Sequence, residues 1–467
     1  MNFDLAPAAA LAALTLVLVQ IALRLPLGAA LASITGPTLR SVAVMRARGV
    51  SDHWKERAMM LYARRTFGGV FRFLAQLGLL AGVAVGIGAG IARVMPGFVE
   101  YSLGVQGLVL TLVVATLWLV VVGRLKPKAA APVSDYTAME QLMHRVALGN
   151  AGVAEMAFAL DQAVTRPDAT AAAEGEHVFV AGLARAGTTV LTRALHESGA
   201  FGSLTYRDMP FVLAPGLWRR LAGKRGGVKA GERAHGDGVI VDTDSPESLE
   251  EPFWRVFDGS AYLKADRLLP HAPEAGLVAK YQRYVGSILK SRKARRYLAK
   301  NNNNILRLAM LAEAFPKAHL LVPFRDPLAH AGSLLAQHLR FIETHAADPF
   351  SRDYMGWLGH HEFGSDHRAF AVGARPEGDR AGRDYWLQEW CGVYEWLLET
   401  APERARFVCY EDLCNDPGVW AGLADELGIA GAAAGFRPVA EAGREGLSAL
   451  EARAYAIYDR LRARSAC

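Results

Sequence analysis

The chain has 467 residues, of which 52% are hydrophobic, with a mean hydropathy of +0.13 and a formal net charge of +6. This length leaves room for two or three domains. The excess of positive charge lies in residues 1–130, which hold 13 Lys and Arg against 4 Asp and Glu, whereas the remainder holds 39 against 42. The pI of 9.1 is therefore no argument for nucleic-acid binding, and we expect no nucleic-acid partner.

Three apolar segments, residues 5–23, 73–91 and 103–122, are each long enough to cross a bilayer. Residues 40–72 are strongly basic, and within them residues 52–67 are predicted to form an amphipathic helix on the membrane surface. Because basic loops stay inside, we expect an outside N-terminus and a cytoplasmic chain after residue 124. The sequence therefore predicts a multi-pass protein of the inner (plasma) membrane.

The remaining sequence predicts a helical linker, residues 131–175, followed by an α/β domain, residues 176–467. In the linker, Ser134 or Asp135 is a possible N-cap of the first helix, and residues 166–176 are predicted to form a loop. Short apolar runs then alternate with helical patterns, which favours an α/β fold with a mostly parallel sheet. The strands are expected at residues 178–181, 239–241, 319–322 and 406–409.

The four cysteines form no metal-ligand pattern and suggest no disulfide framework, which fits a reducing compartment. We expect no bound metal, since no cluster of His, Cys and Asp is present in the sequence.

A glycine-bounded loop between the first predicted strand and a predicted helix, residues 182–189, reads GLARAGTT. Backbone N–H groups and the dipole at a helix start make this geometry suitable for a phosphate. The loop has the G-x-x-x-x-G frame of a nucleoside-triphosphate site, but Thr188 stands where that motif has Lys, and the cation is Arg185. The glycine pattern alone fits an ordinary strand–turn–helix corner equally well.

A second candidate anion site follows the strand expected at residues 319–322. Arg325 lies at the end of this strand, and Ser333 lies eight residues later on the next predicted helix. A guanidinium and a hydroxyl so spaced can share one phosphate. Two separate phosphate sites suit a nucleotide that carries phosphates at both its 5′ and 3′ positions.

On these residues the chain resembles the sulfotransferase family, which uses 3′-phosphoadenosine 5′-phosphosulfate (PAPS). Residues 182–189 are similar to that family's 5′-phosphosulfate loop, and residues 325–333, RDPLAHAGS, to its 3′-phosphate element. Residues 300–302, KNN, and 410–413, YEDL, resemble stretches found before and after that element. The resemblance covers about residues 176–460 and implies a P-loop-like sulfotransferase fold.

The resemblance also implies roles for single residues. Backbone N–H groups of Ala186, Gly187, Thr188 and Thr189 would hold the 5′-phosphate, and Arg185 would stabilise negative charge as the donor bond breaks. Arg325 and Ser333 would bind the 3′-phosphate. The general base would be a carboxylate or His beyond the first helix. Asp208 is favoured, with His235 and Asp237 as the alternatives.

We therefore expect a membrane-bound, PAPS-dependent sulfotransferase without a metal. Its acceptor would be a hydroxyl or amine of a lipid, glycolipid or lipid-linked glycan, because an enzyme for a small soluble metabolite needs no membrane spans. Two alternatives stay open: a P-loop-type kinase, and a membrane-bound nucleotide-binding adaptor that has lost catalysis. The sequence leaves the acceptor, the oligomeric state and a second 3′-phosphate contact open.

Two basic segments have no place in this scheme, residues 218–233 and 290–300. Each is either a solvated surface or a contact for anionic headgroups.

Overall fold

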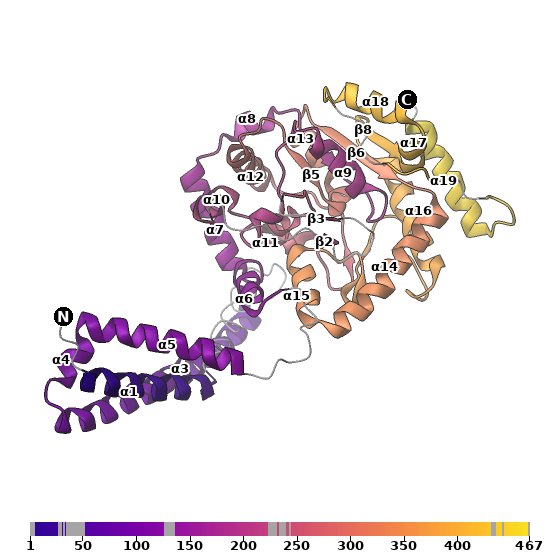
Figure 1. Cartoon of the computed structure of the whole chain (residues 1–467). Coiled ribbons are helices and arrows are strands. Elements are labelled where there is room, and N and C mark those ends of the chain that lie inside the picture. Colours follow the sequence, from indigo (N-terminus) through magenta and orange to yellow (C-terminus); the bar gives the residue numbers. More distant parts are fainter. Residues whose placement is uncertain are drawn as a thin grey trace. The chain divides into compact units, whose positions relative to one another are not determined.

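The computed structural model describes residues 5–26, 30, 33, 52–125, 136–222, 231–232, 240–241, 244–430, 436–440 and 443–465. The chain divides into two compact units, Met1–Pro132 and Val133–Cys467, and its helices and strands are labelled in Figure 1.

The described part of the first unit is helical. Its helices are α1 (Leu5–Arg24), α3 (Asp52–Val94), α4 (Phe98–Leu103) and α5 (Val105–Leu125). Leu11 and Leu14 of α1 form an apolar cluster with Phe98 of α4. Trp118 Nε1 of α5 donates a hydrogen bond to Gln20 Oε1 of α1 at 3.2 Å, so the unit is held by both apolar and polar contacts.

Two described helices are long and apolar enough to cross a membrane by length and composition, Ala6–Arg24 in α1 and Lys55–Val94 in α3. The sequence predicted three. The third predicted span falls in the 21-residue helix α5, whose fully described apolar stretch is Val105–Trp118. The prediction of a separate surface helix at residues 52–67 is wrong, because this segment continues into the second predicted span as the single 43-residue helix α3.

The second unit begins with helices α6 (Ala138–Ala147), α7 (Ala151–Thr165) and α8 (Ala169–Ala173). Thr137 is the N-cap of α6, where it forms a reciprocal capping box with Glu140. The predicted caps Ser134 and Asp135 lie outside the described residues. Helix α8 occupies part of the predicted loop 166–176, because Asp168 accepts a hydrogen bond from Ala171 N–H and starts a turn of small helix-forming residues.

The predicted parallel sheet is confirmed. Four parallel strands run in the order β5-β1-β6-β8. They are β1 (Val178–Val180), β5 (Leu298–Lys300), β6 (His319–Phe324) and β8 (Ala405–Cys409). The sequence did not predict β5, which is only three residues long. The predicted strand at residues 239–241 does not join this sheet: β3 (Ile240–Val241) instead pairs antiparallel with β2 (Gly231–Glu232).

Both faces of the sheet are buried, since alternate residues of a strand enter different cores. Phe179 faces the larger core with Tyr284 of α12 and Tyr394 of α16, whereas Val178 and Val180 face the smaller core formed with α9 and α18. Figure 1 shows helices on both faces of the strands, as an α/β fold requires. This arrangement brings the carboxyl ends of β5, β1 and β6 to one edge.

The remaining elements connect and cover the sheet. Strands β4 (Arg267–Leu268) and β7 (Ala369–Phe370) form a small parallel pair. The 3₁₀ turns are Tyr206–Asp208, Asn302–Arg307 and Gly364–Asp366. The helices are α9 (Thr188–Glu197), α10 (Pro215–Ala222), α11 (Glu251–Tyr262), α12 (Ala275–Arg292), α13 (Leu308–Ala314), α14 (Pro327–Ala347), α15 (Pro349–Leu358), α16 (Arg383–Thr400), α17 (Tyr410–Asn415), α18 (Pro417–Glu426) and α19 (Ala449–Ser465).

Candidate functional site

The loop after β1 adopts a tight shape that its glycines make possible. A Cβ on Gly182 would lie 2.8 Å from Pro323 O, and one on Gly187 would lie 2.3 Å from the Tyr410 ring. Gly187 has φ of 87° and Arg185 has φ of 71°, so the loop contains two residues in the left-handed region. Such a succession turns the backbone into a concave surface suited to an anion.

Side chains of helices α14 and α16 hold this loop in place. His330 of α14 is fully buried, and burial lowers its pKa to about 3, so the imidazole is neutral. Its Nε2 lies 2.8 Å from Ala184 O, and Trp390 Nε1 donates to its Nδ1 at 3.1 Å. These two contacts select the tautomer with the proton on Nε2, which donates to the loop carbonyl.

Helix α9 starts at the end of the loop with Gly187 as its N-cap and no side-chain cap. The N–H groups of a first helical turn have no acceptor inside the helix and are suited to an anion. Ala186 N–H, one of the predicted phosphate donors, already donates a hydrogen bond to Leu183 O inside the loop at 3.2 Å. The assignment of the N–H groups of Gly187, Thr188 and Thr189 to a phosphate stays a prediction.

The two anion sites predicted from the sequence lie together. Arg185 Nε in the loop donates a hydrogen bond to Ser333 Oγ on α14 at 3.1 Å. Adjacent parallel strands cause this meeting, since β1 and β6 are paired and end at the same edge. Arg185, Ser333 and the loop therefore line one continuous site.

Arg325 lies directly after β6, at the start of α14. Its guanidinium stands over the Tyr410 ring at 5.4 Å, and its Nε is 3.9 Å from Glu411 Oε1. That Nε is buried and has no hydrogen-bond acceptor among the described residues. A buried donor in this state costs free energy unless another group accepts its proton, which suits an incoming anion.

The sequence analysis missed a second cation at the loop. Lys300, the last residue of β5, donates through Nζ to Thr189 Oγ1 at 2.9 Å and to Glu247 Oε1 at 2.6 Å. Both partners of this ion pair are largely buried, with 7% and 11% of their side chains exposed. The resemblance of the KNN stretch at residues 300–302 was the signal available in the sequence.

A further polar group follows Lys300. Asn302 Nδ2 donates to Glu362 Oε1 at 2.7 Å, and His360 Nδ1 is 3.5 Å from the same oxygen. Although burial favours a neutral carboxyl, the adjacent His360 lowers the pKa of Glu362 to about 2. Asn302 Oδ1 is buried without a described hydrogen-bond donor. Asn302 is far in the sequence from His360 and Glu362, so the sequence did not predict this cluster.

Asp208, the favoured general base, lies in a different setting. Its carboxylate is 1% exposed, forms an ion pair with Arg292 and accepts a hydrogen bond from Thr205 N–H at 2.9 Å. Burial raises the pKa of Asp208, while Arg292 opposes this rise. These contacts hold the 3₁₀ turn Tyr206–Asp208 against the end of α12. The Asp208 carboxylate thus has structural contacts. The alternative bases His235 and Asp237 lie outside the described residues.

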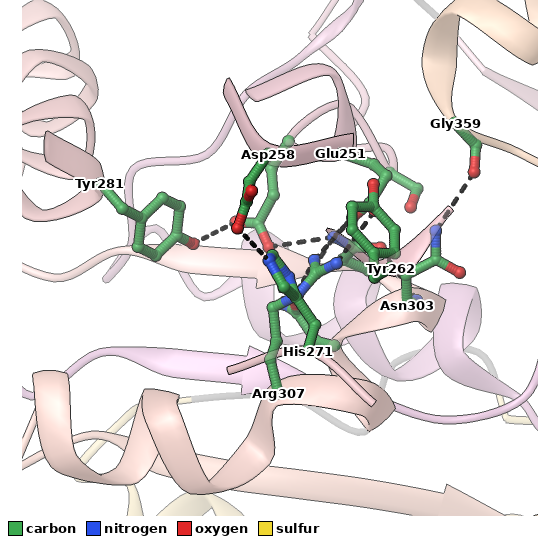
Figure 2. A network of polar contacts seen from close by, with 12 residues as sticks. Glu251, Asp258, Tyr262, His271, Tyr281, Asn303, Arg307 and Gly359 are labelled. Carbon is green, nitrogen blue, oxygen red and sulfur yellow. Dashed lines mark hydrogen bonds and ion pairs between the residues drawn. The ribbon is translucent and has the colours of Figure 1, made fainter. Parts of the chain in front are cut away.

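Glu251, the first residue of α11, belongs to a buried network shown in Figure 2, and Glu250, the N-cap of the same helix, bonds to this network as well. Glu251 forms an ion pair with Arg307 at 2.7 Å, and Arg307 is completely buried. Glu250 accepts hydrogen bonds from Tyr281 at 2.6 Å and from Asn304 at 2.7 Å. Through Asn301 and Asn304 the network holds the turn that follows Lys300, so it supports the site without forming part of it.

A family model described as "Sulfotransferase family" matches residues 177–430. The chain is similar to the solved structure of sulfotransferase STF1 from Mycobacterium tuberculosis H37Rv, with 17% identity, a TM-score of 0.38 and coverage of 71% of this chain and 87% of that chain. It is also similar to sulfotransferase STF9 from Mycobacterium avium, with 17% identity, a TM-score of 0.35 and coverage of 70% and 80%. No curated protein matches the chain.

Proposed function

Since the chain belongs to the sulfotransferase family, we propose that it transfers a sulfuryl group from PAPS to a hydroxyl or amine of a lipid, glycolipid or lipid-linked glycan. The observation that carries this proposal is the 3.1 Å contact between Arg185 and Ser333. The contact joins the loop after β1 to the element that carries Arg325. One ligand with two anionic groups, as in a 3′,5′-substituted nucleotide, would therefore contact both.

The residues present fit such a donor. The first turn of α9 and the loop would receive the 5′-phosphosulfate, with Arg185 and Lys300 as the nearby cations. Arg325 supplies a buried Nε without a described acceptor, and Ser333 supplies a hydroxyl, for the 3′-phosphate. Arg is charged at all physiological pH values, so Arg185 acts by charge stabilisation and not by proton donation.

The transfer itself needs positioning and charge stabilisation more than covalent catalysis. The bond between sulfur and the bridging oxygen of the donor breaks, and the acceptor oxygen or nitrogen bonds to sulfur. Electrons remain on the bridging oxygen, where Arg185 and Lys300 stabilise the negative charge of the departing 3′-phosphoadenosine 5′-phosphate. The acceptor loses its proton to a base.

We favour Glu247 over Asp208 as that base. Both carboxylates are ion-paired, but Glu247 pairs with Lys300, which also bonds to Thr189 at the loop, whereas Asp208 pairs with Arg292 at the end of α12. Glu247→Gln should lower kcat by about 10²- to 10⁴-fold, measured at a temperature where the variant is folded. Asp208→Asn is the control, and it should lower thermal stability instead. A kcat loss in Asp208→Asn alone would contradict this choice.

The lipid acceptor is proposed because the first unit contains two helices of membrane-spanning length and apolarity. In this proposal residues 1–130 anchor the chain in several passes, residues 131–175 link it, and residues 176–467 catalyse transfer on the cytoplasmic side. We therefore propose a plasma-membrane location. An enzyme held at a bilayer would meet amphiphilic acceptors at high local concentration.

Donor binding tests the two-site assignment. Arg325→Ala should weaken binding of 3′-phosphoadenosine 5′-phosphate by about 10- to 100-fold, because it removes a charge-assisted hydrogen bond. Binding of adenosine 5′-phosphate should hardly change. Arg453→Ala, which removes an exposed Arg paired with Glu395, is the matched control. Equal losses for both nucleotides in Arg325→Ala would refute the role of Arg325.

Acceptor identity is tested by mass spectrometry of lipids and glycans from cells that contain or lack the gene. A species heavier by one sulfate, absent also with an Arg185→Ala gene, would support the proposal. Transfer that requires ATP and Mg²⁺ would favour a kinase instead. Nucleotide binding without any sulfated product would favour an adaptor that has lost catalysis.

A further inference from the structure

Helix α7 has an unusual distribution of apolar residues. Its buried side contains Ala154, Ala157 and Phe158. Its solvent side is apolar too, where Met156, Leu160 and Val164 are exposed by 58%, 50% and 40%. These residues follow an i, i+4, i+8 pattern and therefore share one stripe. A helix on the surface of a soluble domain normally presents polar residues on that side.

Helices α6 and α10, which contact α7, also have exposed apolar residues. Leu221 at the end of α10 is 68% exposed, and Met139, Leu142 and Val146 of α6 are exposed as well. Apart from Leu339 and Ile342 on α14, the exposed large apolar side chains described in the second unit all lie on α6, α7 and α10. Concentration on one group of helices distinguishes this surface from ordinary scattered exposure.

A basic pocket lies at the C-terminal end of the α7 stripe. It is lined by Thr165 of α7, Gly216, Arg219 and Arg220 of α10, and Lys290 and Ser291 of α12. The pocket unites two basic segments that are about 70 residues apart in the chain, since Arg219 Nη1 of α10 donates to Ser291 O at 3.1 Å. The sequence alone gave no reason to place these segments together.

The cations of this pocket have no carboxylate partner within salt-bridge distance among the described residues. Arg219 donates to a backbone carbonyl, and Lys290 Nζ donates to Arg166 O at 3.4 Å. Asp161 of α7 is buried, and its Oδ1 accepts a hydrogen bond from Leu217 N–H at 2.6 Å. The positive charge of the pocket is thus available to an external anion.

We propose that the α7–α10 face, defined as Met156, Leu160, Val164 and Leu221 with the cations Arg219, Arg220 and Lys290, lies on an anionic lipid bilayer. Apolar side chains next to Lys and Arg are the composition of helices that lie in a bilayer interface. The apolar stripe would enter the acyl boundary, while the cations contact lipid phosphates. The same chain contains helices of membrane-spanning length, which would keep a bilayer within reach.

Contact between the α7–α10 face and the bilayer would orient the second unit. Its candidate site would then approach acceptors from a constant direction. This inference rests on the surface of the second unit and does not depend on the donor or acceptor proposed above.

The test uses the full chain in nanodiscs of phosphatidylcholine with or without phosphatidylglycerol. A bimane label is placed at Leu160→Cys in a Cys467→Ser background, because Cys391, Cys409 and Cys414 are buried. Lipids with a spin label near the headgroup should quench this bimane strongly. The matched control is Leu339→Cys on α14, also exposed and apolar, which should be quenched little. Equal quenching at both positions would overturn the proposal.

Charge reversal tests the role of the pocket. Arg220→Glu and Lys290→Glu should each lower the ratio of quenched to unquenched bimane at Leu160→Cys by about fivefold or more in discs with phosphatidylglycerol. In discs without phosphatidylglycerol this ratio should fall much less. Lys317→Glu, an exposed control, should leave the ratio unchanged. An unchanged ratio in both pocket variants would overturn the proposal.

Two other partners could cover the α7–α10 face, and each would give a distinct result that overturns the proposal. Cover by the first unit of the same chain would shield the Leu160→Cys label in detergent and prevent quenching by lipids. Cover by a second copy would make the emission depend on the number of chains per disc and not on lipid charge.

Discussion

Two polar clusters lie near the end of strand β5, and they differ in the balance between positive and negative charge. In the network around Arg307, shown in Figure 2, the guanidinium is paired with Glu251, and Glu250 accepts hydrogen bonds from tyrosines and asparagines. At the loop after β1, by contrast, Arg185, Lys300 and Arg325 bring three cations together. Their close carboxylates are Glu247 and Glu411, and Arg325 Nε still lacks a described acceptor.

This difference separates structural charge from functional charge. A buried ion pair that is fully hydrogen-bonded is stable only as a unit, and removal of one partner leaves an uncompensated charge. A group of cations with an unused donor is incomplete without an anion. Burial alone therefore does not identify the site, whereas the balance between donors and acceptors does.

The largest expected effect is on the compensated cluster. Arg307→Ala should lower the free energy of unfolding by about 3–5 kcal/mol, because Glu251 would remain buried without its cation. Thermal and urea unfolding of the full chain in detergent would measure this loss. Arg185→Ala is the control and should unfold like the wild type. Equal destabilisation by both variants would remove the distinction between the clusters.

At the loop the effect should appear in catalysis instead. Arg185→Ala should lower kcat of sulfuryl transfer by about 10²- to 10³-fold, the usual cost of losing one group that stabilises transition-state charge. Single-turnover transfer from labelled PAPS would measure this loss, and Arg185→Lys should recover part of the rate. Unchanged turnover in Arg185→Ala would show that the cation does not act on the leaving group.

Glu389 of α16 is a third case, a buried carboxyl whose Oε2 lies 3.6 Å from His367 Nε2, an imidazole kept neutral because burial lowers its pKa to about 3. Burial raises the pKa of Glu389 to about 7, and its Oε2 has no hydrogen-bond donor among the described residues. The folded state therefore holds the proton more tightly than the unfolded state, whose pKa is about 4.5. Stability that is present below pH 4.5 is lost as the pH rises through 7.

Glu389→Gln should remove this loss. The variant should be about 2–3 kcal/mol more stable than the wild type at pH 8, and the difference should vanish near pH 4. Unfolding measured across this pH range is the test. Glu395→Gln, a change at a half-buried position of the same helix, should show no such pH dependence. A constant difference at all pH values would contradict the burial argument.

The smallest effect is expected at Ser333. Ser333→Ala removes one hydroxyl from the predicted 3′-phosphate site and should weaken binding of 3′-phosphoadenosine 5′-phosphate by about fivefold, the value of one hydrogen bond. Thr344→Ala on the same helix α14, where the hydroxyl bonds only to Arg340 O, is the control. Calorimetry on both variants would measure the difference, and an equal effect would place Ser333 outside the site.

The local motifs of the second unit were predictable from the sequence. The strand, glycine loop and helix at residues 178–197 and the strand and helix around Arg325 depend on neighbouring residues, whose patterns are visible in one dimension. The first unit was less predictable. The change from charged to apolar residues near Phe67 suggested two elements, but helical hydrogen bonds continue across such a change, and α3 does not stop.

The contacts between distant segments were not predictable. Asp208 looked available because it stands soon after the loop in the sequence, but Arg292, 84 residues later, covers it. Glu247 was not considered as a base, because only the fold brings it to Lys300, 53 residues away. Such pairs depend on strand order and helix packing, which no local pattern records.

By itself, the sequence determined an α/β domain with a phosphate-type loop, the family to which the chain belongs, and an apolar N-terminal region. It did so because backbone geometry and hydrophobic periodicity are local properties. Only the tertiary structure decided which cations face the loop, which carboxylates are structural, and which helices leave an apolar face uncovered. These depend on the parallel order β5-β1-β6-β8, which brings residues more than a hundred positions apart to one edge of the sheet.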